Sequence, residues 1–453
     1  MMEKLVESSY KHVLQNINKP NLYKDLFPYD EIPKITFNDI QVPMGLPKDI
    51  WITDTTFRDG QQSMPPYTAE QIIKIYDYLN KLDNNSGIIR QTEFFLYSDK
   101  DRKAAEVCME RGYDFPEVTS WIRANKKDFE LVKKMGIKET GMLMSCSDYH
   151  IFRKLNKSRE EAMKMYLSLV EEALSNGIVP RCHLEDITRA DFYGFVVPFV
   201  NKLMEMSKQS GIQVKIRACD TLGLGVPYSG ASLPRSVQSI IHGLKYCCNV
   251  PSEAIEWHGH NDFYGVVNNA TTAWLYGCSS INTSLLGIGE RTGNCPLEAM
   301  LVEYGQLTGN TKNMNLQLIT EIAEYFKKEM KYDVPPRTPF VGSQFNVTRA
   351  GIHADGILKD EEIYNIFNTD KILNRPVVVA VNQYSGLAGI AAWINTYFRL
   401  KDEDKIDKKD ERILPIKEWV DNQYKNGRNT IIGNNELELI VRQVIPEIFQ
   451  IAS

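Results

Sequence analysis

The stretch DIWITDTTFRDGQQSMPPYTAEQIIKIYDYLNKL (49–82) reads as one strand followed by one helix. Its β-rich start predicts a strand that ends at Asp54. Thr68 and Gln71 form a capping box, which marks the start of the helix. Four apolar residues at helical spacing follow the box: Ile72, Tyr76, Leu79 and Leu82. Because this strand–helix order recurs along the chain, this unit decides the fold.

Seven further β-rich runs follow, and helical stretches separate them. They are Gln91–Leu96, Glu117–Ile122, Thr140–Ser145, Ile178–Leu184, Gln213–Ala218, Ala254–His258 and Ser280–Leu285. Eight such units over roughly 250 residues are what a (β/α)₈ TIM barrel requires, whereas a doubly wound open sheet is the alternative. We predict an N-terminal extension over 1–46, a (β/α)₈ barrel over 47–310, and a mostly helical C-terminal region over 311–453.

The composition is that of an ordinary globular chain. Of its 453 residues, 43% are hydrophobic and 25% are charged, which excludes collagen-like and disordered proteins. The mean hydropathy is -0.33 and the N-terminus has no apolar core, so we expect neither a membrane span nor a secretory signal. The net charge of -5 disfavours nucleic acid as a partner. The eight cysteines form no C-x-x-C pair and fit a reduced, cytoplasmic protein.

Reactive side chains of a β/α barrel lie at the C-terminal ends of its strands. The seventh predicted strand ends in HGHND (258–262), where His258 and His260 can point the same way because side chains alternate along a strand. Two imidazoles and one carboxylate form a metal site that leaves positions open for substrate. The carboxylate can be Asp54 or Asp59 from DTTFRDGQQS (54–63). A packed or surface histidine pair is the alternative.

Other strand ends carry further polar groups. Glu185 and Asp186 follow the fifth strand, and Asp220 and Thr221 follow the sixth. Helix N-caps are the alternative for the two aspartates. Arg123 follows the third strand and can bind a carboxylate with two hydrogen bonds, although a surface ion pair is the alternative.

Five motifs in sequence order carry a more specific signal. They are DTTFRDGQQS (54–63), DTLG (220–223), HGHND (258–262), GIGERTGN (287–294) and GIHADG (351–356). Together they resemble the metal-dependent Claisen-condensing enzymes and lyases that carry a D-x-T-x-R-[DE]-G motif, such as 2-isopropylmalate synthase, homocitrate synthase and 3-hydroxy-3-methylglutaryl-CoA lyase. The resemblance implies a divalent metal ion bound by Asp59, His258 and His260. We expect Mn²⁺, with Mg²⁺, Co²⁺ or Zn²⁺ as alternatives.

The resemblance also implies roles for the other matched residues. They are Arg58 at the reacting oxygen, Gln62 and Thr221 at the oxo acid, and Glu185 and Asn294 along the site. His353 and Tyr364 match a pair that dimers of the family insert into the neighbouring barrel, so we expect a homodimer. Without the resemblance, His353 would be interpreted as a packing histidine. The general base is expected to be either Glu185 or His353 with Tyr364.

The resemblance further implies condensation of acetyl-CoA with a 2-oxo acid. The runs over 120–150 and 381–393 are most similar to those of members that act on oxaloacetate. Arg123 fits the second carboxylate that oxaloacetate and 2-oxoglutarate possess. We therefore expect an acyltransferase that forms citrate and CoA. The alternatives are synthesis of homocitrate from 2-oxoglutarate, then of citramalate or 2-isopropylmalate, and, from a different class, an inactive metabolite-binding barrel.

Overall fold

The computed structural model describes residues 12–123 and 126–451. The chain divides into two compact units, Met1–Asn315 and Leu316–Ser453. Among the described residues, no helix combines the length and apolar character that a bilayer span requires.

The first unit is a closed barrel of eight parallel strands in sequence order. The strands are β1 (Trp51–Asp54), β2 (Ile89–Phe94), β3 (Glu117–Ile122), β4 (Glu139–Ser145), β5 (Val179–Glu185), β6 (Lys215–Asp220), β7 (Ile255–Gly259) and β8 (Ser280–Thr283). The barrel closes where β1 pairs with β8, with Trp51 opposite Ser280. The predicted (β/α)₈ fold is therefore confirmed.

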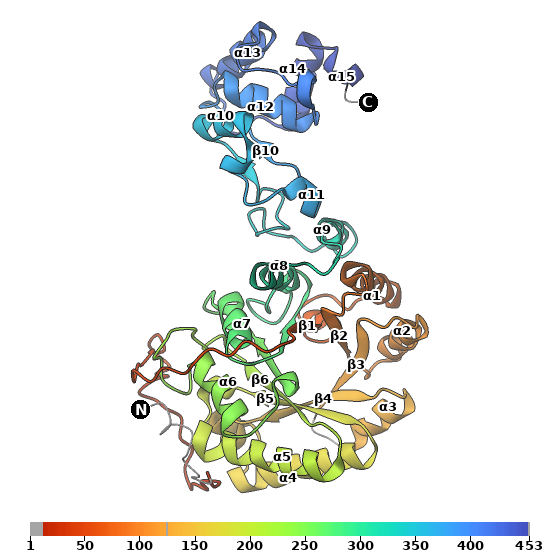
Figure 1. Ribbon diagram of the computed structural model, residues 1–453, viewed down its shortest axis with the longest axis vertical. Helices are drawn as coiled ribbons and strands as arrows, with labels where there is room; N and C mark the ends of the chain where they lie inside the picture. Colours follow the sequence, from red (N-terminus) through yellow and green to blue (C-terminus); the bar gives the residue numbers. More distant parts are fainter. Residues whose placement is uncertain (1–11, 124–125, 452–453) are drawn as a thin grey trace. The chain divides into compact units, whose positions relative to one another are not determined.

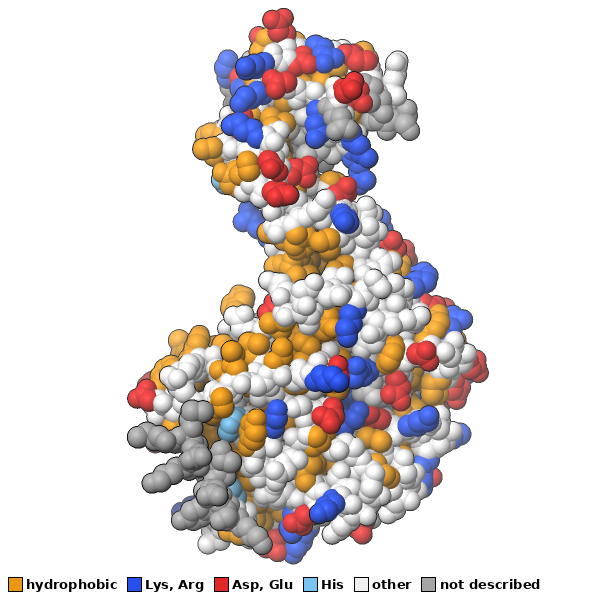
Figure 2. Space-filling view, viewed as in Figure 1, with side chains coloured by type: hydrophobic (Ala, Val, Ile, Leu, Met, Phe, Trp, Pro, Cys, Tyr) orange, Lys and Arg blue, Asp and Glu red, His pale blue; other side chains and the backbone are white. Residues whose placement is uncertain are grey.

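Helices surround the barrel (Figure 1). They are α1 (Ala69–Asp83), α2 (Asp99–Glu110), α3 (Phe129–Lys134), α4 (Arg159–Ser175), α5 (Val197–Ser210), α6 (Val237–Tyr246), α7 (Val266–Leu275) and α8 (Leu297–Thr308). The predicted capping box of Thr68 and Gln71 is present at the start of α1, and the apolar stripe behind it is buried. Acidic and basic side chains are interspersed over the surface around α1 and α2 (Figure 2).

The described part of the N-terminal extension runs along the barrel with almost no regular secondary structure. Its backbone is held by hydrogen bonds. The Gln15 N–H donates to Gly194 O at 2.9 Å, and the Arg235 guanidinium donates to Lys34 O at 2.6 Å. The Gly45 N–H donates to Leu275 O at 2.9 Å. Backbone and side-chain hydrogen bonds therefore attach the described part of the extension to the outside of the barrel.

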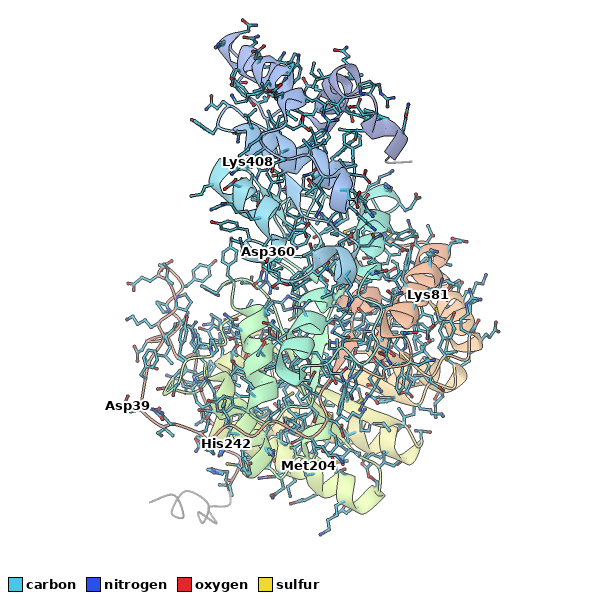
Figure 3. All side chains as sticks on the ribbon, turned by 45° about the horizontal axis from the view of Figure 1, so that its top comes forward. Asp39, Lys81, Met204, His242, Asp360 and Lys408 are labelled. Atoms are coloured by element: carbon cyan, nitrogen blue, oxygen red, sulfur yellow. The ribbon has the colours of Figure 1, made fainter. Side chains whose placement is uncertain are left out.

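The second unit is mostly helical. It contains α9 (Leu318–Lys328), α10 (Gly351–Lys359), α11 (Thr369–Leu373), α12 (Leu387–Tyr397), α13 (Leu414–Lys425), α14 (Asn434–Val444), α15 (Ile448–Ile451) and the paired strands β9 (Val347–Thr348) and β10 (Val378–Val379). Its core is built around buried residues of α12, including Ile390, Trp393 and Ile394. Lys408, labelled in Figure 3, pairs with Asp355 of α10.

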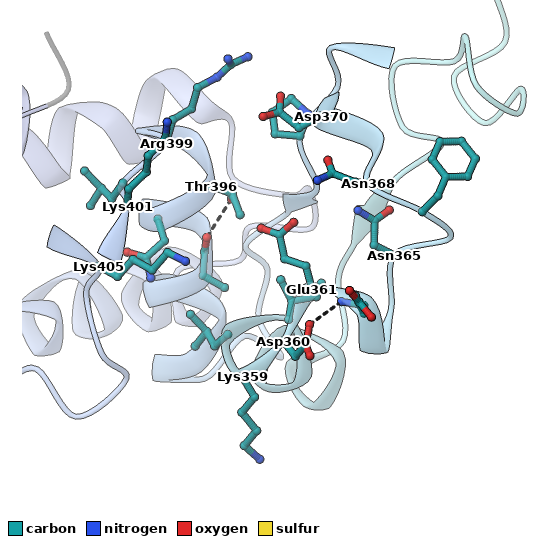
Figure 4. A pocket seen from close by; sticks show the side chains of 18 of the residues that line it. Lys359, Asp360, Glu361, Asn365, Asn368, Asp370, Thr396, Arg399, Lys401 and Lys405 are labelled. Atoms are coloured by element: carbon teal, nitrogen blue, oxygen red, sulfur yellow. Dashed lines mark hydrogen bonds between the residues drawn. The ribbon is translucent and has the colours of Figure 1, made fainter. Parts of the chain in front are cut away.

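A cavity of about 790 Å³ lies within this second unit. Leu358, Ala392 and Leu400 contribute apolar lining. In the view of Figure 4, the cations Arg399, Lys401 and Lys405 lie on one side, and the acidic groups Asp360, Glu361 and Asp370 lie on the other. The charges that face this cavity are therefore mixed in sign.

Candidate active site

Three predicted metal ligands converge at the C-terminal end of the barrel. His258 lies in β7, His260 directly follows it, and the short π-helix η2 (Thr56–Gly60) carries Asp59. All three side chains are buried, and one candidate ligand atom from each lies within 4.8 Å of the others. The Nε2 atoms of the two histidines are 3.3 Å apart, and His260 Nε2 is 3.7 Å from Asp59 Oδ2. This spacing lets the three atoms share one small cation.

The protonation states of the three groups fit a divalent metal. Burial, and then the neighbouring His260, lowers the pKa of His258 to about 3, and burial also lowers the pKa of His260. Burial raises the pKa of Asp59, but the positive charge of Arg58, together with the neighbouring imidazoles of His258 and His260, outweighs burial, so this pKa is lowered. Within the described chain, Asp59 Oδ2 is buried without a hydrogen-bond partner. Neutral imidazoles and an ionised carboxylate with a free oxygen are the states that bind a metal.

A hydrogen-bonded chain orients His258. Its Nδ1 lies 2.8 Å from Asn282 Oδ1, and Asn282 Nδ2 donates to Thr53 Oγ1 at 2.9 Å. The Thr53 hydroxyl in turn donates to Glu256. Because an ionised carboxylate only accepts hydrogen bonds, Glu256 fixes the direction of the whole chain and places the proton of His258 on Nδ1. The lone pair of His258 Nε2 therefore faces the other two ligands.

Arg58 is held beside the triad by two carboxylates. Its Nη1 donates to Asp59 Oδ1 and its Nε to Glu93 Oε2, each at 2.9 Å. The guanidinium also lies 5.3 Å from the centre of the Trp121 ring. The buried Arg58 thus supplies a fixed positive charge next to the candidate metal site.

A cluster of buried charged side chains lies in the barrel interior, two residues before the row of Glu185 and His258 along the strands. Arg217 contacts both Glu93 and Glu256, and Arg181 contacts Glu93 at 3.1 Å. His183 is opposite Arg217 in the register of β5 and β6. Among the described residues, His183 Nε2 and Arg217 Nη2 are buried with no hydrogen-bond partner. Sequence reasoning missed these residues, because their positions inside the barrel depend on strand register.

Glu185 shares one register row with His258, one of the three candidate ligands. Residue pairs across the strands join Ser145 to Glu185, Glu185 to Cys219 and Cys219 to His258. Side chains of one row project to the same side of a sheet, and neighbouring strands are about 4.8 Å apart. Glu185 and His258 are therefore separated by about 10 Å across the mouth of the barrel.

The structure separates the two aspartates that the sequence left open. Asp54 is buried and accepts hydrogen bonds from the hydroxyls of Thr56 at 2.5 Å and Thr92 at 2.6 Å. The Asp54 oxygens are therefore occupied by hydrogen bonds at the end of β1, whereas Asp59 lies beside His258 and His260. Asn294 is buried beside Asp59, where it helps to lower the pKa of that carboxyl, and its side-chain amide donates to Ile288 O at 3.2 Å.

The two residues expected to contact the oxo acid, Thr221 and Gln62, differ in burial. Thr221 is partly buried, and its hydroxyl accepts a hydrogen bond from the Asp186 N–H at 2.8 Å. Gln62 is exposed, while the neighbouring Gln61 is buried and donates to Phe57 O at 3.2 Å.

Arg123 lies at the end of β3 but is not brought to the triad. Its side chain is 66% exposed and contacts Asp128 at 3.5 Å. Its guanidinium also lies 4.9 Å from the centre of the Tyr97 ring. In this structure, Arg123 therefore makes the surface ion pair that was the alternative at the sequence level.

His353 and Tyr364 lie together in the second unit. Their ring centres are 4.2 Å apart, and both side chains are exposed. The exposed side chains of Ile352, Ile363 and Ile366 lie close by in the sequence. The pair therefore belongs to a partly apolar surface of the C-terminal unit.

The chain is similar to known proteins over most of its length. Residues 49–325 match the model of the HMGL-like family. The chain is 75% identical to a citrate (Re)-synthase of Clostridium kluyveri, with 98% of each chain covered. It is 52% identical to a citrate (Re)-synthase of Syntrophus aciditrophicus, over 97% of this chain and 70% of that protein. Among solved structures, a hydroxymethylglutaryl-CoA lyase from Pseudomonas aeruginosa superposes with a TM-score of 0.51 at 21% identity, covering 64% of this chain and 95% of the lyase.

Proposed function

The chain belongs to the HMGL-like family, and we propose that it catalyses the citrate (Re)-synthase reaction, in which acetyl-CoA condenses with oxaloacetate and water to give citrate and CoA. One observation carries this proposal: 75% identity to a protein of that name extends over 98% of both chains. Asp59, His258 and His260 give the proposal a chemical basis, because they lie together as a potential metal site. Homocitrate, citramalate and 2-isopropylmalate synthesis are less well supported.

The metal site binds the reacting end of the oxo acid. Asp59, His258 and His260 would hold a divalent ion, for which Mn²⁺ is our first choice. When bound, such an ion stabilises negative charge on the ketone oxygen as a Lewis acid. Arg58, fixed by Asp59 and Glu93, adds a second positive charge beside that oxygen. A positioned charge of this kind lowers a reaction barrier by roughly 3–4 kcal/mol.

The second carboxylate of oxaloacetate needs a cation or a hydrogen-bond donor. Arg123 is our candidate from the sequence, but it is exposed and already paired with Asp128. Arg217 Nη2 is a buried polar atom, one side-chain step below the row of Glu185 and His258, with no hydrogen-bond partner among the described residues, and His183 Nε2 beside it lies 3.5 Å from Glu93 Oε1 without a hydrogen bond. A buried donor that loses its acceptor costs about 1–3 kcal/mol, so these two groups favour a dicarboxylic acid. The structure thus supports the interior pair more strongly than Arg123.

The remaining contacts complete the catalytic proposal. Thr221 and Gln62 are proposed to contact the oxo acid, and Asn294 to support Asp59. The C–H bond of the acetyl methyl group breaks while its carbon attacks the ketone, and a general base accepts the proton. Glu185, or His353 with Tyr364, would be that base. Water then hydrolyses the thioester and releases CoA.

We further propose a homodimer in the cytoplasm. His353 and Tyr364 would reach the barrel of the second copy, which is consistent with the exposed apolar side chains near them. All eight cysteines are free and seven are buried, as expected for a reducing compartment.

A substrate panel tests the function. Acetyl-CoA is incubated with oxaloacetate, 2-oxoglutarate, pyruvate or 2-oxoisovalerate, and thiol release is followed with Mn²⁺ and with EDTA. We expect release with oxaloacetate and Mn²⁺, loss of activity in EDTA, and citrate as the product. Faster release with 2-oxoglutarate would replace citrate by homocitrate. No release with any oxo acid would favour the inactive metabolite-binding barrel.

A further inference from the structure

Glu185 is held by three donors that come from one side of the barrel. Ser145, the last residue of β4, donates its hydroxyl proton to Glu185 Oε2. His150 Nδ1 lies 2.9 Å from the same oxygen. Lys154 Nζ lies 3.0 Å from Oε1 and 2.9 Å from Oε2. His150 and Lys154 are four residues apart on the short π-helix η4 (Tyr149–Lys154). The segment after β4 therefore provides the groups that pair with the Glu185 carboxylate at the end of β5.

These contacts make Glu185 a weak base in the free protein. Burial raises the pKa of Glu185, but the hydrogen bond and charge of His150, the Ser145 hydroxyl and the charge of Lys154 outweigh burial and lower the pKa to about 2. A general base works best when its pKa is close to the working pH. Glu185 lies in the register row of His258, a position that suits proton transfer at the candidate active site. The contacts that lower the pKa of Glu185, however, disfavour its acceptance of a proton.

The three donors differ in how easily they can leave. Ser145 is buried, and the His150 side chain is only 18% exposed. His150 is also held from its other ring nitrogen, which lies 3.7 Å from the buried Asp186. The Lys154 side chain is 48% exposed and has a flexible stem. An exposed ion pair of this kind is worth about 0–1 kcal/mol, so a competing anion can break it.

Building on the proposed function, we propose that Lys154 is a displaceable counter-ion of Glu185. An anionic group of the bound substrates draws the Lys154 ammonium away, while Ser145 and His150 keep the carboxylate in place. Glu185 then accepts the methyl proton of acetyl-CoA, and the electron pair of the broken C–H bond forms the new C–C bond to the ketone carbon. Lys154 is thus a positioning residue: it keeps Glu185 from removing the methyl proton of acetyl-CoA until the displacing anion is bound. The anion is a carboxylate of the oxo acid or a phosphate of CoA.

Hydrogen exchange tests this mechanism without turnover. Acetyl-pantetheine, a thioester without the phosphates of CoA, is incubated in D₂O with Mn²⁺ and no oxo acid, so that neither candidate anion is present, and deuterium in its methyl group is measured by mass spectrometry. We expect slow exchange in the wild-type protein and at least fivefold faster exchange in Lys154→Met. Lys154→Arg should behave as the wild type. Exchange in Lys154→Met that is no faster than in the wild type would overturn the proposal.

Further variants control this comparison. Arg153→Met removes a neighbouring positive charge that lies over the Tyr149 ring, and it should exchange as the wild type does. Adding Glu185→Gln to Lys154→Met should abolish the extra exchange; if exchange persists, the proton goes elsewhere and the proposal fails. Thermal melting verifies that each variant folds, and Lys154→Gln replaces Lys154→Met if the latter does not.

Two more measurements separate the remaining outcomes. If a phosphate of CoA displaces Lys154, the wild-type protein turns over acetyl-pantetheine with oxaloacetate at least fivefold more slowly than acetyl-CoA, because acetyl-pantetheine has no phosphate. Turnover of acetyl-pantetheine then recovers in Lys154→Met. If a carboxylate of oxaloacetate is the anion, Lys154→Met does not change the ratio of the two thioesters. Citrate formation by the wild-type protein is assayed in the same preparation. Its absence refutes the proposed function, whereas citrate formation with unchanged exchange in Lys154→Met refutes this inference alone.

Discussion

Replacing Asn282 by leucine tests whether the interior of the barrel sets the metal affinity. Asn282 is fully buried and connects His258 Nδ1 to Thr53, and through Thr53 to Glu256. Leucine has a similar volume but cannot accept the proton of His258. The imidazole then loses the contact that fixes its tautomer and ring orientation.

The expected effect follows from the position of Asn282 behind a metal ligand. Loss of such an outer contact weakens metal binding about 10–100-fold, which is about 1.4–2.7 kcal/mol. The orphaned Nδ1–H of His258 costs a further ~1–3 kcal/mol of stability in the metal-free protein. A metal concentration 100 times the wild-type Kd stabilises that protein by about 2.7 kcal/mol, whereas the variant gains only about 0.4–1.4 kcal/mol. For the unit Met1–Asn315, these values correspond to metal-induced Tm shifts of roughly 4 °C and about 0.6–2 °C, at about 2.1 cal/mol/K of unfolding entropy per residue.

Calorimetric titration of the metal-free proteins with Mn²⁺ and thermal melting provide the two measurements. Asn269→Leu is the matched control, because Asn269 is also buried in the barrel unit but donates to Gly225 O. This control should lower the Tm without changing the metal affinity. If Asn282→Leu bound Mn²⁺ within twofold of the wild-type affinity, the argument that Glu256, Thr53 and Asn282 orient His258 would be wrong.

Three other predictions concern separate parts of the chain. Arg123→Gln should change the KM for oxaloacetate less than threefold, because the side chain is exposed and paired with Asp128; a tenfold increase would restore Arg123 as the carboxylate contact. Burial raises the pKa of Glu298 to about 7 against the opposing effect of its backbone hydrogen bonds. The folded protein therefore holds this proton more tightly than the unfolded chain, and the stability that protonated Glu298 contributes is lost as the pH rises from about 4.5 to 7. Glu298→Gln should remove that loss, and an unchanged dependence of Tm on pH would contradict it. Inactive His353→Ala and His258→Ala proteins should recover activity when mixed under subunit exchange, and no recovery would exclude a shared site.

The sequence was sufficient to predict the barrel and to name the three candidate ligands. Strand–helix alternation and the capping box of Thr68 and Gln71 are local signals, so they are readable before tertiary structure is known. The H-x-H spacing at the end of β7 likewise predicts that His258 and His260 point the same way, because side chains alternate along a strand. The resemblance to the D-x-T-x-R-[DE]-G enzymes supplied the expectation that Asp59, rather than Asp54, is the third ligand.

The residue pattern alone left some side chains with similar sequence contexts undistinguished, and the tertiary structure gives the physical reason for the difference between them. Asp54 and Asp59 are five residues apart, yet hydrogen bonds from Thr56 and Thr92 occupy Asp54, while Asp59 meets the two histidines. The buried ions below the site and the contacts of Lys154 with Glu185 depend on which strands are neighbours and on their register. Burial and register arise from contacts between residues far apart in the chain. Local patterns therefore give the residue types at each strand end, and the closed barrel decides which of them meet.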